Sequence, residues 1–131
     1  MEPGESRMKV LALDYGSART GVAVSDPTGT VARPVAIVAK VNKPAGFNEL
    51  VALIRAEEPG LVVVGLPLTL KGEHGEQARE TADFVERLRA RIETPVEMWD
   101  ERFTSVLADG DDAKAAAHLL SSFLEWQSSR V

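Results

Sequence analysis

The sequence predicts an α/β domain in which packed helices cover a mixed five-stranded sheet. Three observations carry this prediction. Three β-rich segments are joined by short turns, an apolar strand lies between two amphipathic helical patterns, and a further helical pattern occupies the C-terminal end. The chain has 131 residues, which suits one domain with its own core. We therefore expect a disordered leader over residues 1–7 and a single domain over residues 8–131.

The first part of the chain predicts an antiparallel meander of three strands. Residues 8–14 form a nearly unbroken apolar run, which is typical of a central strand covered on both faces. A turn at residues 15–17 leads into a second strand over 20–26, and a third strand follows over 30–39. Pro34 lies inside the third strand, so we expect an edge position or a bulge there.

The rest of the chain alternates helices with strands. Apolar residues at helical spacing predict helices over 48–57, 77–92 and 113–126. Residues 61–66 form a fully apolar strand, and residues 95–99 form a short fifth strand. Because crossover connections between parallel strands are right-handed, these segments should extend the sheet that the meander begins.

Composition excludes several classes of function. The chain has no cysteine, which removes disulfide scaffolds, zinc knuckles, iron–sulfur sites and thiol catalysis. Aromatic residues make up only 5%, which argues against a base-stacking platform, and the net charge of −5 argues against a protein that coats nucleic acid. No segment is long and apolar enough to cross a bilayer or to act as a signal peptide, so we expect a cytoplasmic protein with no membrane partner.

Three acidic residues are candidates for a metal site. Asp14 ends the first strand, Glu101 follows the fifth, and Asp112 opens the last helix. Because sites in α/β sheets form where strands end, these carboxylates could meet at one edge and hold Mg²⁺. Other roles also fit: Asp14 as a turn former, Glu101 as an ion-pair partner of Arg102, and Asp112 as a helix N-cap, which explains it equally well. Asp111 competes with Asp112 for either role.

Two glycine-containing loops are candidates for phosphate contacts. Residues 14–21 form a hairpin turn that could present Ser17, Arg19 and backbone N–H groups to a phosphate, although a plain hairpin has the same pattern. Residues 65–72 leave a buried strand and carry Lys71 ahead of a helix N-terminus; a flexible connection explains this loop equally well.

Several motifs occur along the chain in a fixed order. They are Leu13-Asp14-Tyr15-Gly16, Arg19-Thr20-Gly21-Val22-Ala23-Val24-Ser25-Asp26, Val64-Gly65-Leu66-Pro67-Leu68 with Lys71-Gly72, Asp100-Glu101-Arg102-Phe103-Thr104-Ser105, and Asp112 at the start of an Ala/Leu helix. This combination resembles the YqgF family, also called RuvX, whose members are described as Holliday junction resolvases or pre-16S ribosomal RNA processing nucleases. The resemblance covers roughly residues 8–126 and implies an RNase H-like fold.

The resemblance implies roles for particular residues. Asp14, Glu101 and Asp112 match the family's acidic triad, which would hold Mg²⁺ or Mn²⁺ and activate a water for phosphodiester hydrolysis. Candidates for phosphate contacts are Arg19 and Arg102, which lie inside the motifs, and Lys71 and Arg79, which rest on loop position alone.

The chain departs from the family pattern at one place. Only ten residues separate Glu101 from Asp112, whereas family members have a clearly longer stretch there. We interpret the difference as a mobile segment absent from this sequence, with a true deletion as the alternative.

The leading functional hypothesis is a metal-dependent nuclease acting on structured RNA, as in pre-16S rRNA processing during ribosome biogenesis, or on branched DNA, as in Holliday junction resolution. The partners would then be a ribosomal RNA precursor or branched DNA, with ribosomal particles as a further partner. The protein itself would be a monomer or a homodimer. Two alternatives are a non-catalytic nucleic-acid-binding module for ribosome biogenesis and an ATP-binding fragment of the actin and sugar-kinase type. Neither the choice between RNA and DNA nor that between endonuclease and exonuclease follows from the residues.

Overall fold

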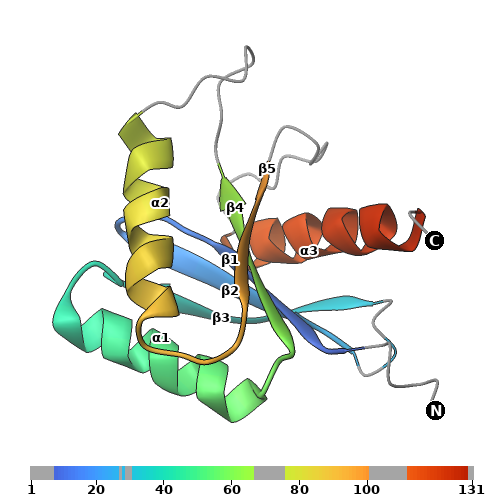
Figure 1. Cartoon of the computed structure of the whole chain (residues 1–131), viewed down its shortest axis with the longest axis horizontal. Coiled ribbons are helices and arrows are strands. Elements are labelled where there is room, and N and C mark those ends of the chain that lie inside the picture. The colour runs from blue at the N-terminus through green and yellow to red at the C-terminus, as the bar shows by residue number, and fades with distance from the viewer. Residues whose placement is uncertain (1–7, 27, 29–30, 67–75, 101–111, 130–131) are drawn as a thin grey trace.

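The computed structural model describes residues 8–26, 28, 31–66, 76–100 and 112–129, and these form a three-layer α/β arrangement (Figure 1). A five-stranded sheet lies between helices α1 and α2 on one face and α3 on the other. The elements in chain order are β1 (Val10–Asp14), β2 (Arg19–Ser25), β3 (Ala32–Ala39), α1 (Pro44–Glu57), β4 (Leu61–Leu66), α2 (Glu76–Arg89), β5 (Val96–Asp100) and α3 (Asp112–Ser129).

The strand order is β3-β2-β1-β4-β5, so the first strand in the chain is central, as the sequence predicts. The strands β1, β2 and β3 pair antiparallel, whereas β4 and β5 join parallel to β1. The proline effect is also confirmed: β3 is an edge strand, and the β2–β3 register shifts between Val22 and Ala23, where Ala23 pairs with Pro34.

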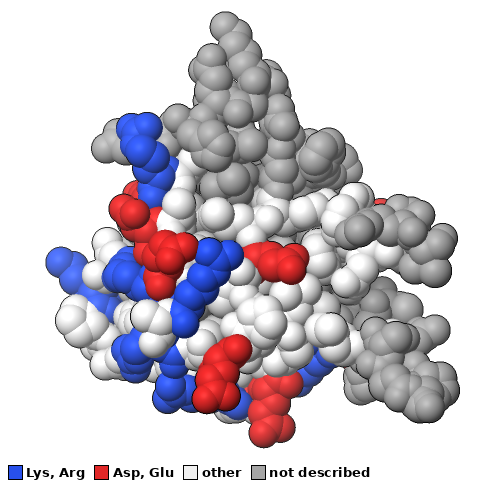
Figure 2. All heavy atoms as spheres, in the orientation of Figure 1, with Lys and Arg blue, Asp and Glu red and all other residues white. Residues whose placement is uncertain are grey.

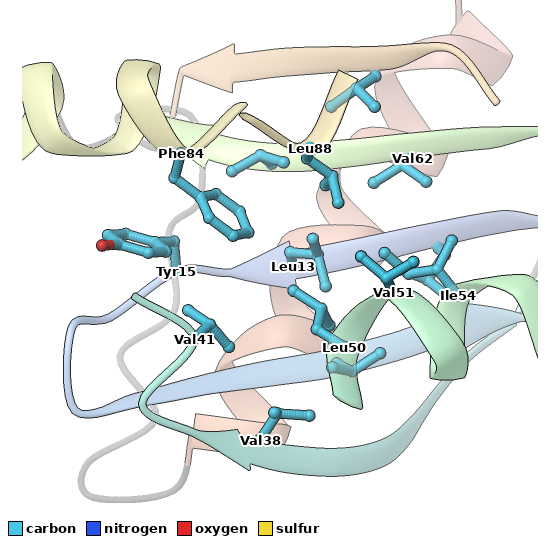
Figure 3. Packing of buried hydrophobic residues seen from close by; sticks show 14 of the residues in the cluster. Leu13, Tyr15, Val38, Val41, Leu50, Val51, Ile54, Val62, Phe84 and Leu88 are labelled. Atoms are coloured by element: carbon cyan, nitrogen blue, oxygen red, sulfur yellow. The ribbon is translucent and has the colours of Figure 1, made fainter. Parts of the chain in front are cut away.

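The face under α1 and α2 holds the larger part of the core (Figure 3). Alternate residues of β1 and β4 point to this face, and they pack against apolar residues spaced three and four apart on the helices. Phe84 of α2 is fully buried in this layer, as are Leu50 and Leu88. The strand residues involved include Leu11, Leu13, Val22, Val24, Val62 and Val64.

The opposite face is covered by α3 and has smaller side chains at its centre. Ala12 of β1, Ala23 of β2 and Ala116 of α3 are all fully buried in one cluster. Because these side chains are short, the helix backbone can lie close to the middle of the sheet. Leu119, Leu120 and Phe123 complete the apolar stripe of α3.

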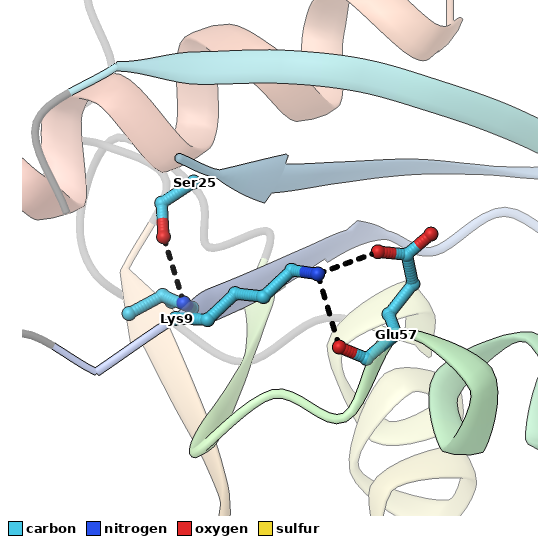
Figure 4. Close-up of polar contacts among 4 residues, drawn as sticks. Lys9, Ser25 and Glu57 are labelled. Carbon is cyan, nitrogen blue, oxygen red and sulfur yellow. Dashed lines mark hydrogen bonds and ion pairs between the residues drawn. The ribbon is translucent and has the colours of Figure 1, made fainter. Parts of the chain in front are cut away.

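Specific polar contacts fasten the edge of the sheet where β1 begins (Figure 4). The Lys9 Nζ donates to Oε1 of Glu57 at 2.8 Å and to the Glu57 carbonyl oxygen at 3.0 Å, which ties the end of α1 to the start of β1. The Val10 N–H donates to the Ser25 Oγ at 2.8 Å in a buried position. The Gly60 N–H donates to the Lys9 carbonyl oxygen at 2.8 Å, so the entry to β4 is fixed to the same strand.

Several helix boundaries differ from those that the periodicity predicts: α3 continues to Ser129 rather than ending at residue 126, and α2 and α3 each begin one residue earlier than predicted. Helix α1 begins at Pro44 rather than at residue 48, because proline suits the first helical position, where its missing N–H costs nothing. Helix α2 ends at Arg89 rather than at residue 92. Ile92 still packs against the core from the turn that follows, which explains why the apolar pattern outlasts the helix. No described helix combines the length and the apolar character that crossing a bilayer requires.

Candidate active site

The candidate site lies at the edge of the sheet where the parallel strands end. Strands β1, β4 and β5 run in the same direction, with Leu13 paired to Val64 and Val64 paired to Met98. Asp14 is the last residue of β1, and Asp100 is the last residue of β5. The carboxyl ends of these strands therefore meet at one edge, which is where α/β sheets place their binding sites.

Asp14 belongs to the face of the sheet that α3 covers. Side chains alternate along a strand, and Val10 and Ala12 of β1 pack in the α3 cluster. By the same alternation, the Asp14 side chain lies on the face that α3 covers, and Asp14 is half-buried. Asp112 is the first residue of α3, so two of the three predicted carboxylates come from elements that pack together on this face.

The structure tests the predicted acidic triad only in part. Glu101 lies outside the described residues, and the side chain of Asp112 is also outside the described part of the chain. Among the residues whose side chains are described, no group of three or more histidine, aspartate or glutamate residues could hold a metal ion. The convergence of Asp14, Glu101 and Asp112 therefore stays a prediction.

The turn after Asp14 is closely packed and carries two of the predicted phosphate contacts. A Cβ at Gly16 would lie 2.4 Å from the Arg19 carbonyl oxygen, so only glycine fits there. The Thr20 hydroxyl donates to the Gly16 carbonyl oxygen at 3.2 Å, which closes the turn. Ser17 and Arg19 are both exposed beside Asp14. The turn thus presents a hydroxyl and a guanidinium to solvent on a constrained backbone.

The other predicted phosphate contacts are more scattered. Arg79 is exposed in the first turn of α2, the end of that helix nearest the carboxyl edge of the sheet (Figure 1). Lys71 and Arg102 lie outside the described residues.

Tyr15, the residue after Asp14, makes a contact that the sequence analysis missed. Its ring is buried and stacks on Phe84 with centroids 4.6 Å apart, as Figure 3 shows. Its hydroxyl donates to Oε2 of Glu80 on α2 at 2.8 Å. Burial and the neighbouring Glu80 carboxylate raise the pKa of Tyr15 to about 12. Because the phenol stays protonated, it joins α2 to the end of β1 next to Asp14.

Glu80 occupies a position that helical periodicity assigns to the solvent side of α2. The structure instead places Glu80 half-buried, as the acceptor for Tyr15. The one sequence signal for this contact is the pairing of a tyrosine in a mainly apolar stretch with an acidic residue in the first turns of a later helix.

Comparison with known families gives a match over most of the chain. The family model described as RuvX, Holliday junction resolvase, matches residues 8–126. A protein of Rubrobacter xylanophilus named "Putative pre-16S rRNA nuclease" is 43% identical over 139 residues, covering 95% of this chain and 96% of its own. A protein of the same name from a Sulfurihydrogenibium species is 48% identical over 103 residues, covering 77% of this chain and 70% of its own.

The Rubrobacter match spans 139 residues although this chain has 131, so the alignment includes positions that the relative has and this chain lacks.

Solved structures share the fold at low sequence identity. The RuvC protein of T. thermophilus, in complex with a Holliday junction substrate, superposes with a TM-score of 0.60 and 14% identity, covering 93% of this chain and 96% of that one. The fowlpox virus resolvase, solved with Holliday junction DNA, gives a TM-score of 0.54 and 13% identity, covering 95% of this chain and 99% of that one. The architecture is therefore the RNase H-like fold that the sequence resemblance implies.

Proposed function

The chain belongs to the RuvX family of Holliday junction resolvases, and from this premise we propose that it is a metal-dependent nuclease that hydrolyses phosphodiester bonds in structured RNA or branched DNA. The observation that carries the proposal is the position of Asp14. A half-buried carboxylate ends the central strand, on the face covered by the helix that Asp112 opens. A carboxylate at that place supplies the hard oxygen donors that a divalent cation prefers.

We propose Asp14, Glu101 and Asp112 as the residues that hold Mg²⁺ or Mn²⁺. Their carboxylate oxygens are the hard donors that these ions prefer, and Glu101 directly follows the last residue of β5 in the chain. When bound, the cation supplies Lewis-acid stabilisation of the charge that develops on the phosphodiester. Asp14 is suited to its role because its backbone is held in register with Gly21 across the β1–β2 pair.

Other residues of this chain would bind and orient the substrate. Ser17 and Arg19 are exposed on the constrained turn beside Asp14, where a hydroxyl and a guanidinium suit a phosphate oxygen. Arg79 is exposed at the start of α2, and the bond from Tyr15 to Glu80 holds that part of the helix against β1. Lys71 and Arg102 complete the proposed set of phosphate contacts.

The names of the relatives point to two substrates. The curated relatives are named for precursor 16S rRNA, and the family model is named for Holliday junctions. A junction-resolving enzyme needs a two-fold dimer to make paired cuts, whereas RNA cleavage has no such requirement. Sedimentation of the active protein, with and without substrate, measures the oligomeric state in solution. That state distinguishes the two substrates. Binding to ribosomal particles remains a further part of the proposal.

The test is cleavage of end-labelled precursor rRNA and four-way junction DNA with Mg²⁺ or Mn²⁺. We expect Asp14→Asn to lower the cleavage rate by more than about 100-fold, because even residues that only support a metal ligand cost 10 to 100-fold when replaced. The same loss is expected for Glu101→Gln and Asp112→Asn, and chelation of the metal should abolish wild-type cleavage.

Asp26→Asn is the matched control, since it makes the same chemical change where β2 ends, beside the start of β1. Asp26 accepts hydrogen bonds from Thr28 and from the Val31 N–H, which an asparagine can partly keep. Wild-type cleavage by Asp14→Asn would refute the proposed role of that residue. Tight binding without cleavage by the wild-type protein would instead identify a non-catalytic module, and specific ATP binding would favour the kinase-like alternative.

A further inference from the structure

Three arginine side chains gather where the C-terminal end of α2 meets α1. The Cζ atoms of Arg87 and Arg91 each lie 5.4 Å from the centroid of the Phe47 ring. The Arg55 Nη2 donates to the Arg91 carbonyl oxygen at 2.7 Å, which places a third guanidinium against the backbone of Arg91. All three arginines are exposed, while Phe47 beneath them is only 8% exposed.

The acidic residues around these arginines do not form ion pairs with them within the described part of the chain. Glu86 pairs with Arg89 at 2.8 Å and Glu57 pairs with Lys9 at 2.8 Å, while Glu58 and Glu93 line the same cavity as Arg55 and Arg91. No ion pair joins Arg55, Arg87 or Arg91 to a described carboxylate, and the contacts with the Phe47 ring leave their charges in place. On the face seen in Figure 2, Lys and Arg side chains lie over α1 and α2, with acidic side chains among them.

Arg87 and Arg91 share one aromatic ring, and an anion that bridges two guanidinium groups offsets their mutual repulsion. A guanidinium offers a planar fork of N–H donors that matches a phosphate, and stacking on an aromatic ring keeps its edge free to donate. A cavity of about 620 Å³ adjoins the cluster, with Arg55 and Arg91 on its wall. Because Glu58 and Glu93 also line that cavity, a phosphate passing over the arginines is favoured over an anion held deep inside.

The cluster is connected to the candidate active site through a row of aromatic rings. Phe47 contacts Phe84 edge to face with centroids 6.3 Å apart, and Phe84 stacks on Tyr15 at 4.6 Å. Tyr15 directly follows Asp14. These rings are buried and fix where the arginines lie relative to Asp14. A strand of duplex DNA rises about 3.4 Å per nucleotide, so several nucleotides would span the distance from the carboxyl edge of the sheet to the arginines.

We propose that Arg55, Arg87 and Arg91 form a phosphate-binding surface that holds the substrate strand away from the site of cleavage. This inference rests on the proposed function for the identity of the ligand, a nucleic-acid backbone. The surface contacts the backbone and does not distinguish base sequences. It contributes affinity through counterion release and orients the strand relative to Asp14.

The test measures how binding depends on salt. Anisotropy of fluorescein-labelled precursor rRNA and junction DNA is recorded between 50 and 300 mM KCl in the Asp14→Asn background, so that cleavage does not interfere. We expect Arg87→Gln and Arg91→Gln each to reduce the slope of log Kd against log salt by about 1, and the double variant by about 2. Arg87→Lys should keep the slope, because it keeps the charge.

Arg33→Gln is the matched control, because Arg33 is exposed on the edge strand β3 and its substitution removes the same charge. Its slope should equal that of the parent protein. Equal slopes for Arg33→Gln and the Arg87→Gln/Arg91→Gln double variant would overturn the proposed surface. The proposed function would still stand in that case if the protein with Asp14 intact cleaves the nucleic acid. If the Asp14-intact protein neither binds nor cleaves either nucleic acid, both proposals are wrong. Thermal melting of each variant checks that the fold is retained.

Discussion

The two faces of the sheet differ in what fills them. The face under α1 and α2 is packed with leucine, valine, isoleucine and phenylalanine, whereas the face under α3 has alanine at its centre on both the sheet and the helix. Asp14 belongs to the second face, two residues after the buried Ala12. One face therefore supplies most of the apolar burial, while the other face brings a helix close to the strand that carries the candidate site.

Removing a large side chain tests the first half of this comparison and should have the largest effect on stability. We expect Phe84→Ala to lower the free energy of unfolding by about 3–5 kcal/mol, since the ring is fully buried between Tyr15 and Phe47 and leaves a cavity. Urea unfolding followed by far-UV circular dichroism measures the change.

Phe123→Ala makes the same truncation on the α3 face. Its ring contacts Trp126, which is 43% exposed, so the neighbouring side chains can relax and water can enter. We expect a smaller loss than for Phe84→Ala. An equal or larger loss would show that the α3 face bears as much of the stability as the other face.

Adding volume tests the second half of the comparison. Ala116→Leu should lower the free energy of unfolding by about 1–3 kcal/mol, because Ala116 is fully buried against the sheet and the larger side chain pushes α3 outward. Cleavage should fall as well, since Asp112 opens the same helix. Ser121→Leu adds apolar volume at an exposed position of α3 and should leave stability and cleavage near the wild-type values. Unchanged cleavage by a destabilised Ala116→Leu protein would show that cleavage does not depend on the position of α3.

The smallest effect concerns pH and the contact between Tyr15 and Glu80. The pKa of Tyr15 is raised from 10.0 to about 12 in the folded protein, so folding favours the protonated phenol. The stabilisation is therefore fully present below pH 10 and is lost as the pH rises from 10 towards 12. Tyr15 is the single tyrosine of the chain, so absorbance at 295 nm during a pH titration reports on it alone.

Tyr15→Phe keeps the stacked ring, and it should remove this part of the alkaline loss of stability. A tyrosine that titrates near pH 10 in the native protein would contradict the buried hydrogen bond to Glu80.

The topology could be predicted from the sequence because it follows from local signals. Short turns favour antiparallel pairing of neighbouring strands, and helical connections favour right-handed parallel crossovers, so the meander and the parallel strands that follow it could be predicted. The choice of β1 rather than β3 as the neighbour of β4 depends on packing. The position of Pro34 opposite the register shift was predictable for the same local reason. The start of α1 was missed because apolar periodicity begins after the first turn, and Pro44 was the signal that marked it.

The candidate site was less accessible to sequence reasoning. Asp14 could be placed because a strand end is a local feature. The contact of Tyr15 with Glu80 joins residues 65 positions apart, and it depends on how α2 crosses the sheet, which no local pattern specifies. The arginine cluster has the same origin, since Arg55 and Arg91 are 36 positions apart and meet only through helix packing. Glu101, Lys71 and Arg102 lie outside the described residues, so their places stay predictions.

The order of strands also bears on how the protein is made. Leu11 of the central strand pairs with Val24 on one side and with Val62 on the other, so β1 leaves the ribosome long before its second neighbour exists. At about 5–20 residues per second, the nascent chain carries an open hydrophobic strand edge for roughly 3 to 10 seconds. Such an edge invites pairing with other chains, so chaperone protection during biosynthesis matters most in that interval.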